Sequence, residues 1–260
     1  MKYVYCFFFL LLATFSFSQR EKVPTYFGLH FRPIIPSNFV GNTTLSLAKD
    51  NYKVSLIQTL GNSFGVTVRA GITKLIAFET GIMYTTRNFT TDMTIIDTTS
   101  AGFGDVLLNV KDDLKFINYE IPLNALVYVK LTNEIYMNAS LGAAVRFAPT
   151  NIGKLTVTGG PNSFDNYGGI YKGQRAGINL NANYGFEYRT KKSGFFYLGG
   201  SVSIPLGTIM YLQSGHIVQS QTATNYVLGE VDGSYLGIDL KYFFHNVEKK
   251  GVQPIQGPIL

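Results

Sequence analysis

Hydrophobic and polar residues alternate with a period of two along most of the chain, most clearly from Ser234 to Phe244. One face of this segment carries Leu236, Ile238, Leu240, Tyr242 and Phe244, and the other carries Tyr235, Gly237, Asp239, Lys241 and Phe243. Successive side chains of a strand point to opposite faces. An apolar face opposite Gly, Asp and Lys is typical of a strand with lipid on one side and a polar interior on the other.

Eight segments alternate in this way: 26–33, 64–72, 75–86, 116–130, 135–147, 178–188, 196–206 and 234–244. Short turns join the second to the third, the fourth to the fifth and the sixth to the seventh. The other connections are long, at 34–60, 87–115, 148–174 and 207–233. Short turns that alternate with long loops are typical of outer-membrane barrels, with the short turns in the periplasm. We therefore expect an all-β fold, an eight-stranded antiparallel up-and-down transmembrane β-barrel.

Two other fold classes fit the pattern less well. A soluble β-sandwich can also alternate, but Asn, Gly, Arg and Glu on the inner face would make a poor dry core. No segment after the N-terminus approaches ~18 consecutive apolar residues, so helical membrane spans are not expected.

The first 18 residues read as a cleaved secretory signal. They carry Lys2, an apolar core and the small-residue pattern Ser16-Phe17-Ser18 ahead of Gln19. A retained anchor is the alternative, but the apolar run is shorter than the ~20 residues that a spanning helix needs. We expect the barrel to occupy residues 19–245 and a periplasmic tail to occupy 246–260. Cys6, the only cysteine, would leave with the signal.

The last strand also resembles the C-terminal signal by which outer-membrane barrels are recognised for insertion. The spacing is Tyr235-x-Gly237-x-x-Leu240-x-Tyr242, followed by Phe244. The predicted location is therefore the bacterial outer membrane, with outer-membrane lipid as a partner of the apolar face.

The interior of an eight-stranded barrel is just wide enough for its own side chains. Inward positions hold nearly balanced charges, and an unpaired ion in so narrow a space would be costly. If Tyr128 lies opposite Asn138, the same register places Glu120 opposite Arg146. A three-residue turn centred on Lys74 places Arg69 opposite Glu79. We expect both to be ion pairs in the lumen.

Candidate chemistry is sparse. The three histidines, His30, His216 and His245, have no Ser or acid at an obvious same-face spacing, so no catalytic residue is expected and the chain is predicted not to be an enzyme. No metal-ligand spacing and no cofactor motif is found. The formal charge of +6 has no basic stripe behind it, so nucleic acid is not an expected partner.

By its geometry the chain resembles small eight-stranded outer-membrane barrels such as the OmpA and OmpX transmembrane domains. In the ending Ser16-Phe17-Ser18-Gln19 and the stretch Tyr119-Glu120-Ile121-Pro122-Leu123 it also resembles the PorT-like barrel proteins of Bacteroidota. The resemblance implies an outer-membrane location and an accessory role in secretion or assembly machinery, and it implies no catalytic residue. Those barrels commonly end at the last strand, whereas this chain continues to Leu260.

The long loops contain many apolar residues, such as Leu45, Leu56, Met210 and Val227. Either the strands continue above the membrane as packed hairpins, or the loops bury this surface against a partner. Asp97-Thr98-Thr99 resembles the glycosylation sequon of Bacteroidota. We expect a non-catalytic structural or accessory subunit of a larger outer-membrane protein complex, with protein partners at the loops and the tail. A small transport or ligand-binding barrel is the alternative.

Overall fold

The computed structural model describes residues 25–73, 75–96, 106–157, 162–169, 175–190, 193–218 and 225–245. The expected signal peptide (1–18), the tail (246–260) and Asp97-Thr98-Thr99 lie outside these residues. In the described part of the chain, no helix is long and apolar enough to cross a membrane.

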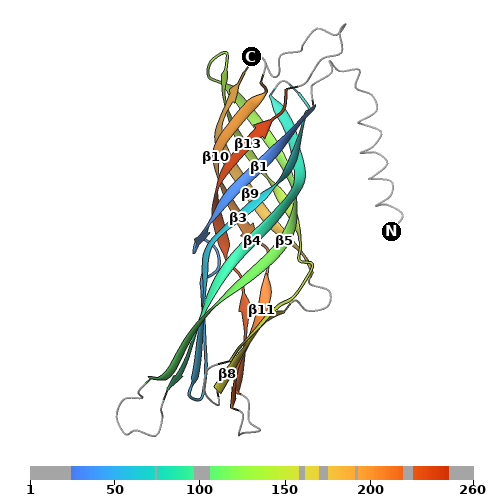
Figure 1. Ribbon diagram of the computed structural model, residues 1–260. Coiled ribbons are helices and arrows are strands. Elements are labelled where there is room, and N and C mark those ends of the chain that lie inside the picture. The colour runs from blue at the N-terminus through green and yellow to red at the C-terminus, as the bar shows by residue number, and fades with distance from the viewer. Residues whose placement is uncertain are drawn as a thin grey trace, which may run out of the picture.

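Eight strands pair into a closed antiparallel ring, which we call the barrel (Figure 1). In chain order they are β1 (Thr25–Ser37), β3 (Tyr52–Gly71), β4 (Ile76–Ile96), β5 (Val106–Lys130), β6 (Ile135–Phe147), β9 (Ala176–Arg189), β10 (Phe195–Pro205) and β13 (Ser234–Phe243). The ring closes because β1 pairs with β13 on one side and with β3 on the other. The predicted eight-stranded up-and-down barrel is confirmed.

The outer surface of the barrel is an apolar belt. On β6, exposed Ile135, Leu141, Val145 and Phe147 alternate with buried Tyr136, Asn138 and Arg146. The 13 residues of β6 rise ~3.3 Å each and tilt by ~40°, so the belt is ~30 Å tall, close to the ~25 Å apolar band of membrane barrels. This height and composition fit a membrane-spanning surface.

Aromatic side chains line both margins of the belt. Near the margin opposite the short turns, one row of register partners runs across five neighbouring strands: Phe31, Phe64, Tyr84, Tyr119 and Phe147. Near the short turns, the ring of Tyr242 lies 4.9 Å from that of Phe196 and 5.3 Å from that of Phe244. Paired rows of this kind mark the two interfaces of a membrane barrel.

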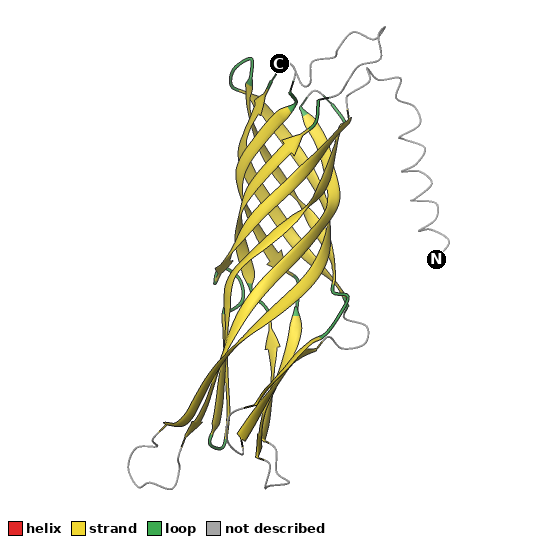
Figure 2. Ribbon diagram, in the orientation of Figure 1, coloured by secondary structure: helices red, strands yellow, loops and turns green. Residues whose placement is uncertain are grey.

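Five further strands and the long ends of three barrel strands form a second unit, which we call the extension (Figures 1 and 2). The added strands are β2 (Thr44–Lys49), β7 (Ile152–Val157), β8 (Asn162–Gly169), β11 (Met210–Val218) and β12 (Asn225–Val231). Strands β7, β8, β11 and β12 make a four-stranded sheet. Strand β2 and residues 52–60, 87–96 and 106–118 of β3, β4 and β5 form the sheet that faces it.

Many apolar residues of the predicted long loops are buried inside the extension. Its two sheets enclose one buried cluster next to the barrel and another farther out. The first contains Leu56, Phe89, Phe116, Met210 and Leu212, and the second contains Tyr52, Val54, Met93, Phe164 and Val227. Most of each predicted long loop is therefore strand, because these side chains bury against one another as packed hairpins.

Side chains bridge the two seams where the sheets of the extension meet without a backbone ladder. At the seam of β5 and β7, Lys154 and Thr156 both contact the carboxylate of Asp112. At the seam of β2 and β12, an added β-carbon on Gly229 would lie 2.8 Å from atoms of both Leu45 and Leu47. The lack of a side chain at Gly229 is what lets the two edges approach.

The short turns and both described chain ends lie at one end of the barrel, and the extension lies at the other (Figure 1). We call the first the turn end. Its turns are held by side chains, as where the Thr132 hydroxyl accepts a hydrogen bond from the Ile135 amide at 3.0 Å. Gly194, with φ 81°, allows the tight turn between β9 and β10.

Candidate functional site: the barrel lumen

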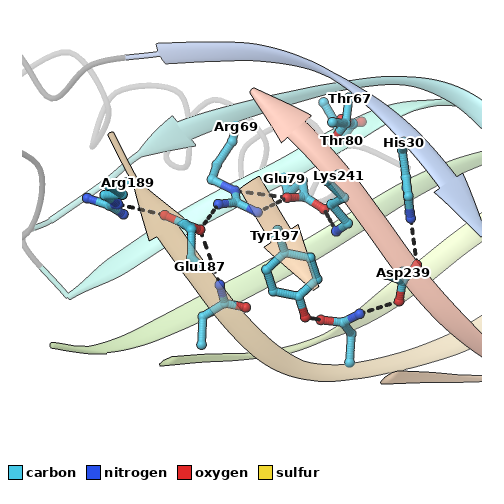
Figure 3. Close-up of polar contacts among 12 residues, drawn as sticks. His30, Thr67, Arg69, Glu79, Thr80, Glu187, Arg189, Tyr197, Asp239 and Lys241 are labelled. Atoms are coloured by element: carbon cyan, nitrogen blue, oxygen red, sulfur yellow. Dashed lines mark hydrogen bonds and ion pairs between the residues drawn. The ribbon is translucent and has the colours of Figure 1, made fainter. Parts of the chain in front are cut away.

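A chain of ion pairs runs through the half of the lumen nearest the turn end (Figure 3). Arg189 contacts Glu187 at 2.6 Å, and Glu187 contacts Arg69 at 2.5 Å. Arg69 also contacts Glu79 at 2.6 Å, and Glu79 accepts a hydrogen bond from Lys241. Three cations thus alternate with two carboxylates from β3, β4, β9 and β13. The predicted Arg69–Glu79 ion pair forms in the expected register.

A second group of contacts is centred on Asp239 (Figure 3). Its carboxylate lies 2.5 Å from His30 Nε2 and 2.5 Å from Arg32 Nε. The side-chain amide of Asn183 donates to the same carboxylate and accepts from the Tyr197 hydroxyl. These inward residues join β1, β13, β10 and β9, which are four consecutive strands of the ring.

Aromatic rings and guanidinium groups close the turn end of the lumen. The guanidinium carbon of Arg69 lies 4.2 Å from the Phe243 ring centre, and that of Arg189 lies 4.0 Å from the Tyr136 ring centre. The rings of Phe195 and Phe243 stack with their centres 4.5 Å apart. Cation–π contacts are strongest where water is excluded, so this plug is favoured in a buried setting.

Glu120 and Arg146 lie opposite each other in the predicted register but are not an ion pair among the described contacts. The Glu120 carboxylate accepts hydrogen bonds from Asn118 at 2.9 Å, Asn179 at 3.3 Å and Tyr235 at 3.2 Å. Arg146 instead donates to the Thr208 carbonyl at 3.3 Å. The two residues are therefore in the expected register but do not contact each other as expected, because neutral side chains from β5, β9 and β13 bond to the carboxylate instead.

Two arginines were not predicted as lumen residues. Arg189 lies beyond the end of the predicted segment 178–188, but its side chain folds inward over Tyr136. Arg87 was assigned to a loop, but it is buried and donates to Gln58 at 2.6 Å and to the Gly233 carbonyl at 2.9 Å. Strand alternation extended past residue 86 would have identified Arg87 as inward-facing.

The lumen is covered at the other end by the buried cluster nearest the barrel. Leu114, Phe116, Met210, Leu212 and Val231, members of this cluster, are each at most 4% exposed. They come from β5, β11 and β12, so both sheets of the extension contribute. Apolar packing therefore covers the lumen on the side of the extension, and ion pairs and aromatic rings fill it on the side of the turn end.

The predicted insertion-signal residues divide between the two faces of β13 as expected from the alternation. Leu240 and Phe244 are exposed on the belt, where the Tyr242 hydroxyl also donates to the Ser193 carbonyl at 2.6 Å. Tyr235 is buried and reaches Glu120. Gly237 also faces inward, and the Arg32 side chain lies 2.7 Å from where its β-carbon would be.

Ser214 and His216, which fall in the predicted long connection 207–233, are instead part of β11 and are buried in the extension. Ser214 is hydrogen-bonded to the Tyr52 hydroxyl at 2.7 Å and donates to Asn166 at 2.5 Å. Burial raises the pKa of Tyr52 to about 12 and lowers the pKa of His216. Among the described residues, no group of three or more His, Cys, Asp or Glu is placed to hold a metal ion.

No protein-family model and no curated protein sequence matches the chain. Among solved structures, the chain is similar to the β-domain of the Bordetella autotransporter Brka, at 7% identity and a TM-score of 0.20. The likeness covers 87% of this chain and 100% of that one. A TM-score of 0.20 is too low to bear on function, so the fold rests on the strand pairing above, and the resemblance to PorT-like proteins stays a prediction.

Proposed function

We propose that the chain is a non-catalytic outer-membrane barrel that serves as a structural or accessory subunit of a larger outer-membrane complex. Its turn end faces the periplasm, its extension stands outside the cell, and it contacts protein partners through the extension and the C-terminal tail. The observation that carries this proposal is the filled lumen. A barrel whose interior is occupied by ion pairs from both halves of the ring acts through its surface.

The transport alternative is disfavoured by the same contacts. A conducting path would have to separate Arg69 from Glu79 or Glu187, which leaves buried charges unpaired at several kcal/mol each. The path would also have to open the apolar cluster that covers the lumen. No contact among the described residues would compensate for the separated ion pairs or for the opened cluster.

The outer-membrane location is supported by the belt. A closed ring satisfies every backbone group along its wall, which is the condition for a strand structure to cross lipid. The exposed aliphatic residues between the two aromatic rows provide the lipid contact.

Purification in mild detergent and reconstitution test the proposal together. We expect at least one protein to co-purify in a fixed ratio, and we expect planar bilayers with the purified barrel to conduct no more than protein-free bilayers. Deletion of Val247 to Leu260 should reduce co-purification while insertion is kept. A barrel that purifies alone and gives discrete conductance steps would establish the transport alternative instead.

A further inference from the structure

The two outer faces of the extension differ sharply in chemistry. The outer face of the β2–β5 sheet is polar, and its side chains bond to one another: Ser46 with Ser55 at 3.1 Å, Thr90 with Asp113 at 2.8 Å, and Asn109 with Asp92 at 2.6 Å. The outer face of the four-stranded sheet carries exposed Leu155, Tyr167, Tyr226 and Leu228. We call this second surface the tyrosine face. Because both surfaces belong to the same extension, general exposure to water does not explain the difference.

Glycines lie beneath both tyrosine rings of the tyrosine face. An added β-carbon on Gly169 would lie 2.7 Å from the Tyr167 ring, and one on Gly153 would lie 3.4 Å from another atom of the same ring. The Tyr167 ring therefore lies down across two strands. The Tyr226 ring lies over Gly215, its cross-strand partner, in the same way.

Hydrogen-bonding groups lie between the two rings. Across the strands, one row of register partners runs Leu228, Gln213, Tyr167, and the next runs Tyr226, Gly215, Asp165, Leu155. Gln213 thus stands between Leu228 and Tyr167, and Asp165 stands between Gly215 and Leu155. Amide and carboxylate groups accept hydrogen bonds from hydroxyls, and the amide also donates.

The charge of the tyrosine face selects between ligand classes. Its described residues include the carboxylates of Asp165 and Glu230, and no Lys or Arg points outward from them. A phosphorylated or sulfated ligand would meet only like charge here. A neutral ligand with hydroxyl groups would bond to Gln213 and Asp165 without that repulsion.

The spacing of the two tyrosine residues suits a chain of linked units. The α-carbons of Tyr167 and Tyr226 are two strands and two residues apart, which corresponds to ~12 Å at ~4.8 Å per strand and ~3.3 Å per residue. The apolar C–H face of a sugar ring packs on an aromatic face, while its hydroxyls point sideways to polar groups. Flat rings with hydrogen-bonding groups between them match that pattern.

We propose that the tyrosine face binds a neutral glycan, with sugar rings on Tyr167 and Tyr226 and hydroxyls bonded to Gln213 and Asp165. This activity goes beyond the accessory role and does not depend on it. A protein partner docked on the same face is the competing occupant, and the test separates the two.

Affinity electrophoresis of the full chain in mild detergent tests the proposal directly. The gels would contain neutral polysaccharides (dextran, a β-glucan and a mannan), with dextran sulfate as the anionic comparison. We expect at least one neutral polymer to retard the protein and dextran sulfate not to do so. Tyr167→Ala and Tyr226→Ala together should weaken the retardation by about tenfold or more.

Controls come from the same chain. Phe39→Ala removes an exposed aromatic residue that lies outside the tyrosine face, and Ile57→Ala removes the exposed aliphatic residue of the polar face. Both should bind as the unchanged protein does. If protease digestion shows that the double tyrosine variant is unfolded, Gln213→Ala with Asp165→Asn provides the second test. This pair should weaken binding as well.

Three results would overturn the proposal. These are no retardation by any neutral polymer, equal retardation by dextran sulfate, and binding that survives both pairs of substitutions. If the double tyrosine variant loses a co-purifying protein while its retardation by the polysaccharides is unchanged, the tyrosine face would be assigned to a protein partner instead. Conductance and the tail deletion test the accessory role separately from these outcomes.

Discussion

Arg69 joins three parts of the barrel wall through one side chain. Its guanidinium contacts carboxylates from β4 and β9 and packs on the Phe243 ring of β13. Removing one member of a buried group of ion pairs destabilises the fold by more than the intact group stabilises it, because the remaining charges are left buried without a partner. The stability of the barrel should therefore depend strongly on Arg69.

The first prediction follows from this position. Arg69→Gln should lower the free energy of unfolding by about 3–5 kcal/mol, the range for breaking a buried ion pair. The measurement is urea unfolding in detergent micelles, supported by the temperature of the heat-dependent gel shift. Lys53→Gln, at an exposed position of the extension, is the control and should change neither quantity.

A second prediction compares the two expected ion pairs by double-mutant cycles. Arg69→Gln and Glu79→Gln should be coupled by about 1–3 kcal/mol, because the two side chains touch. Glu120→Gln and Arg146→Gln should be nearly additive, because Glu120 is bonded to Asn118, Asn179 and Tyr235. Strong coupling in the second cycle would mean that Glu120 and Arg146 pair directly.

Sequence reasoning reached the register of these residues but only part of their contacts. Strand alternation and turn length place Arg69 opposite Glu79 and Glu120 opposite Arg146, because both are local properties. The partner of a long side chain depends on what crosses the lumen from distant strands. Glu187, which shares Arg69 with Glu79, lies 118 residues away, and no spacing rule links the two.

At the scale of the element, β3 and β4 approach each other closely where Gly65 lies. An added β-carbon at Gly65 would collide with the carbonyl oxygen of Ile82, which is backbone and cannot rotate away. At Gly200 on β10, by contrast, no atom lies within 4 Å of an added β-carbon. The two glycines therefore offer a matched pair of substitutions.

We predict that Gly65→Ala destabilises the barrel by about 1–3 kcal/mol, the range for overpacking, whereas Gly200→Ala leaves it unchanged. Urea unfolding of both variants in the same micelles measures the difference. Equal stability of the two variants would mean that β3 and β4 separate at Gly65 without cost.

The seam between β5 and β7 should depend on pH. Burial alone would raise the pKa of Asp112, but hydrogen bonds from Lys154 and Thr156 and the Lys154 charge lower it overall. A carboxyl whose pKa is lowered on folding stabilises the folded state above its unfolded pKa of about 3.9, and this contribution is lost as the pH falls through the folded value.

We therefore predict that β7 becomes more accessible to protease as the pH falls from about 4 towards 2. An acid-active protease such as pepsin provides the measurement. Asp112→Asn should remove most of the pH dependence in that interval, and Asp113→Asn, at the neighbouring outward position, should keep it. Identical pH profiles for Asp112→Asn and the unchanged chain would rule out the seam as the cause.

The elements of the barrel were more predictable than those of the extension. The barrel segments alternate, because one face meets lipid and the other meets a polar lumen. The added strands of the extension are short, and their apolar residues face a core built from segments as distant as Leu56 and Leu212. Such a core is non-local, so composition indicated buried surface without indicating the sheet that buries it.

At the scale of the whole molecule, the short turns and the extension lie at opposite ends of the barrel, so they should face opposite sides of the membrane. Ser193 lies in a short turn, and Lys53 lies on the extension, so Ser193→Cys and Lys53→Cys report on the two ends of the barrel. We predict that a membrane-impermeant thiol reagent labels Lys53→Cys in intact cells and labels Ser193→Cys only after the outer membrane is permeabilised. Labelling of both in intact cells would contradict the topology.

The pairing of β4 with β5 keeps one register from Ile76 opposite Val127 to Ile95 opposite Leu108. The two strands thus run without interruption from the apolar belt to the far end of the extension. Residues 106–118 alone span ~40 Å along the strand at ~3.3 Å each. Such a ribbon is a rigid support and not a flexible linker. A molecule bound to the extension is held at a fixed distance from the lipid and in a fixed orientation, and it rotates only when the whole barrel rotates.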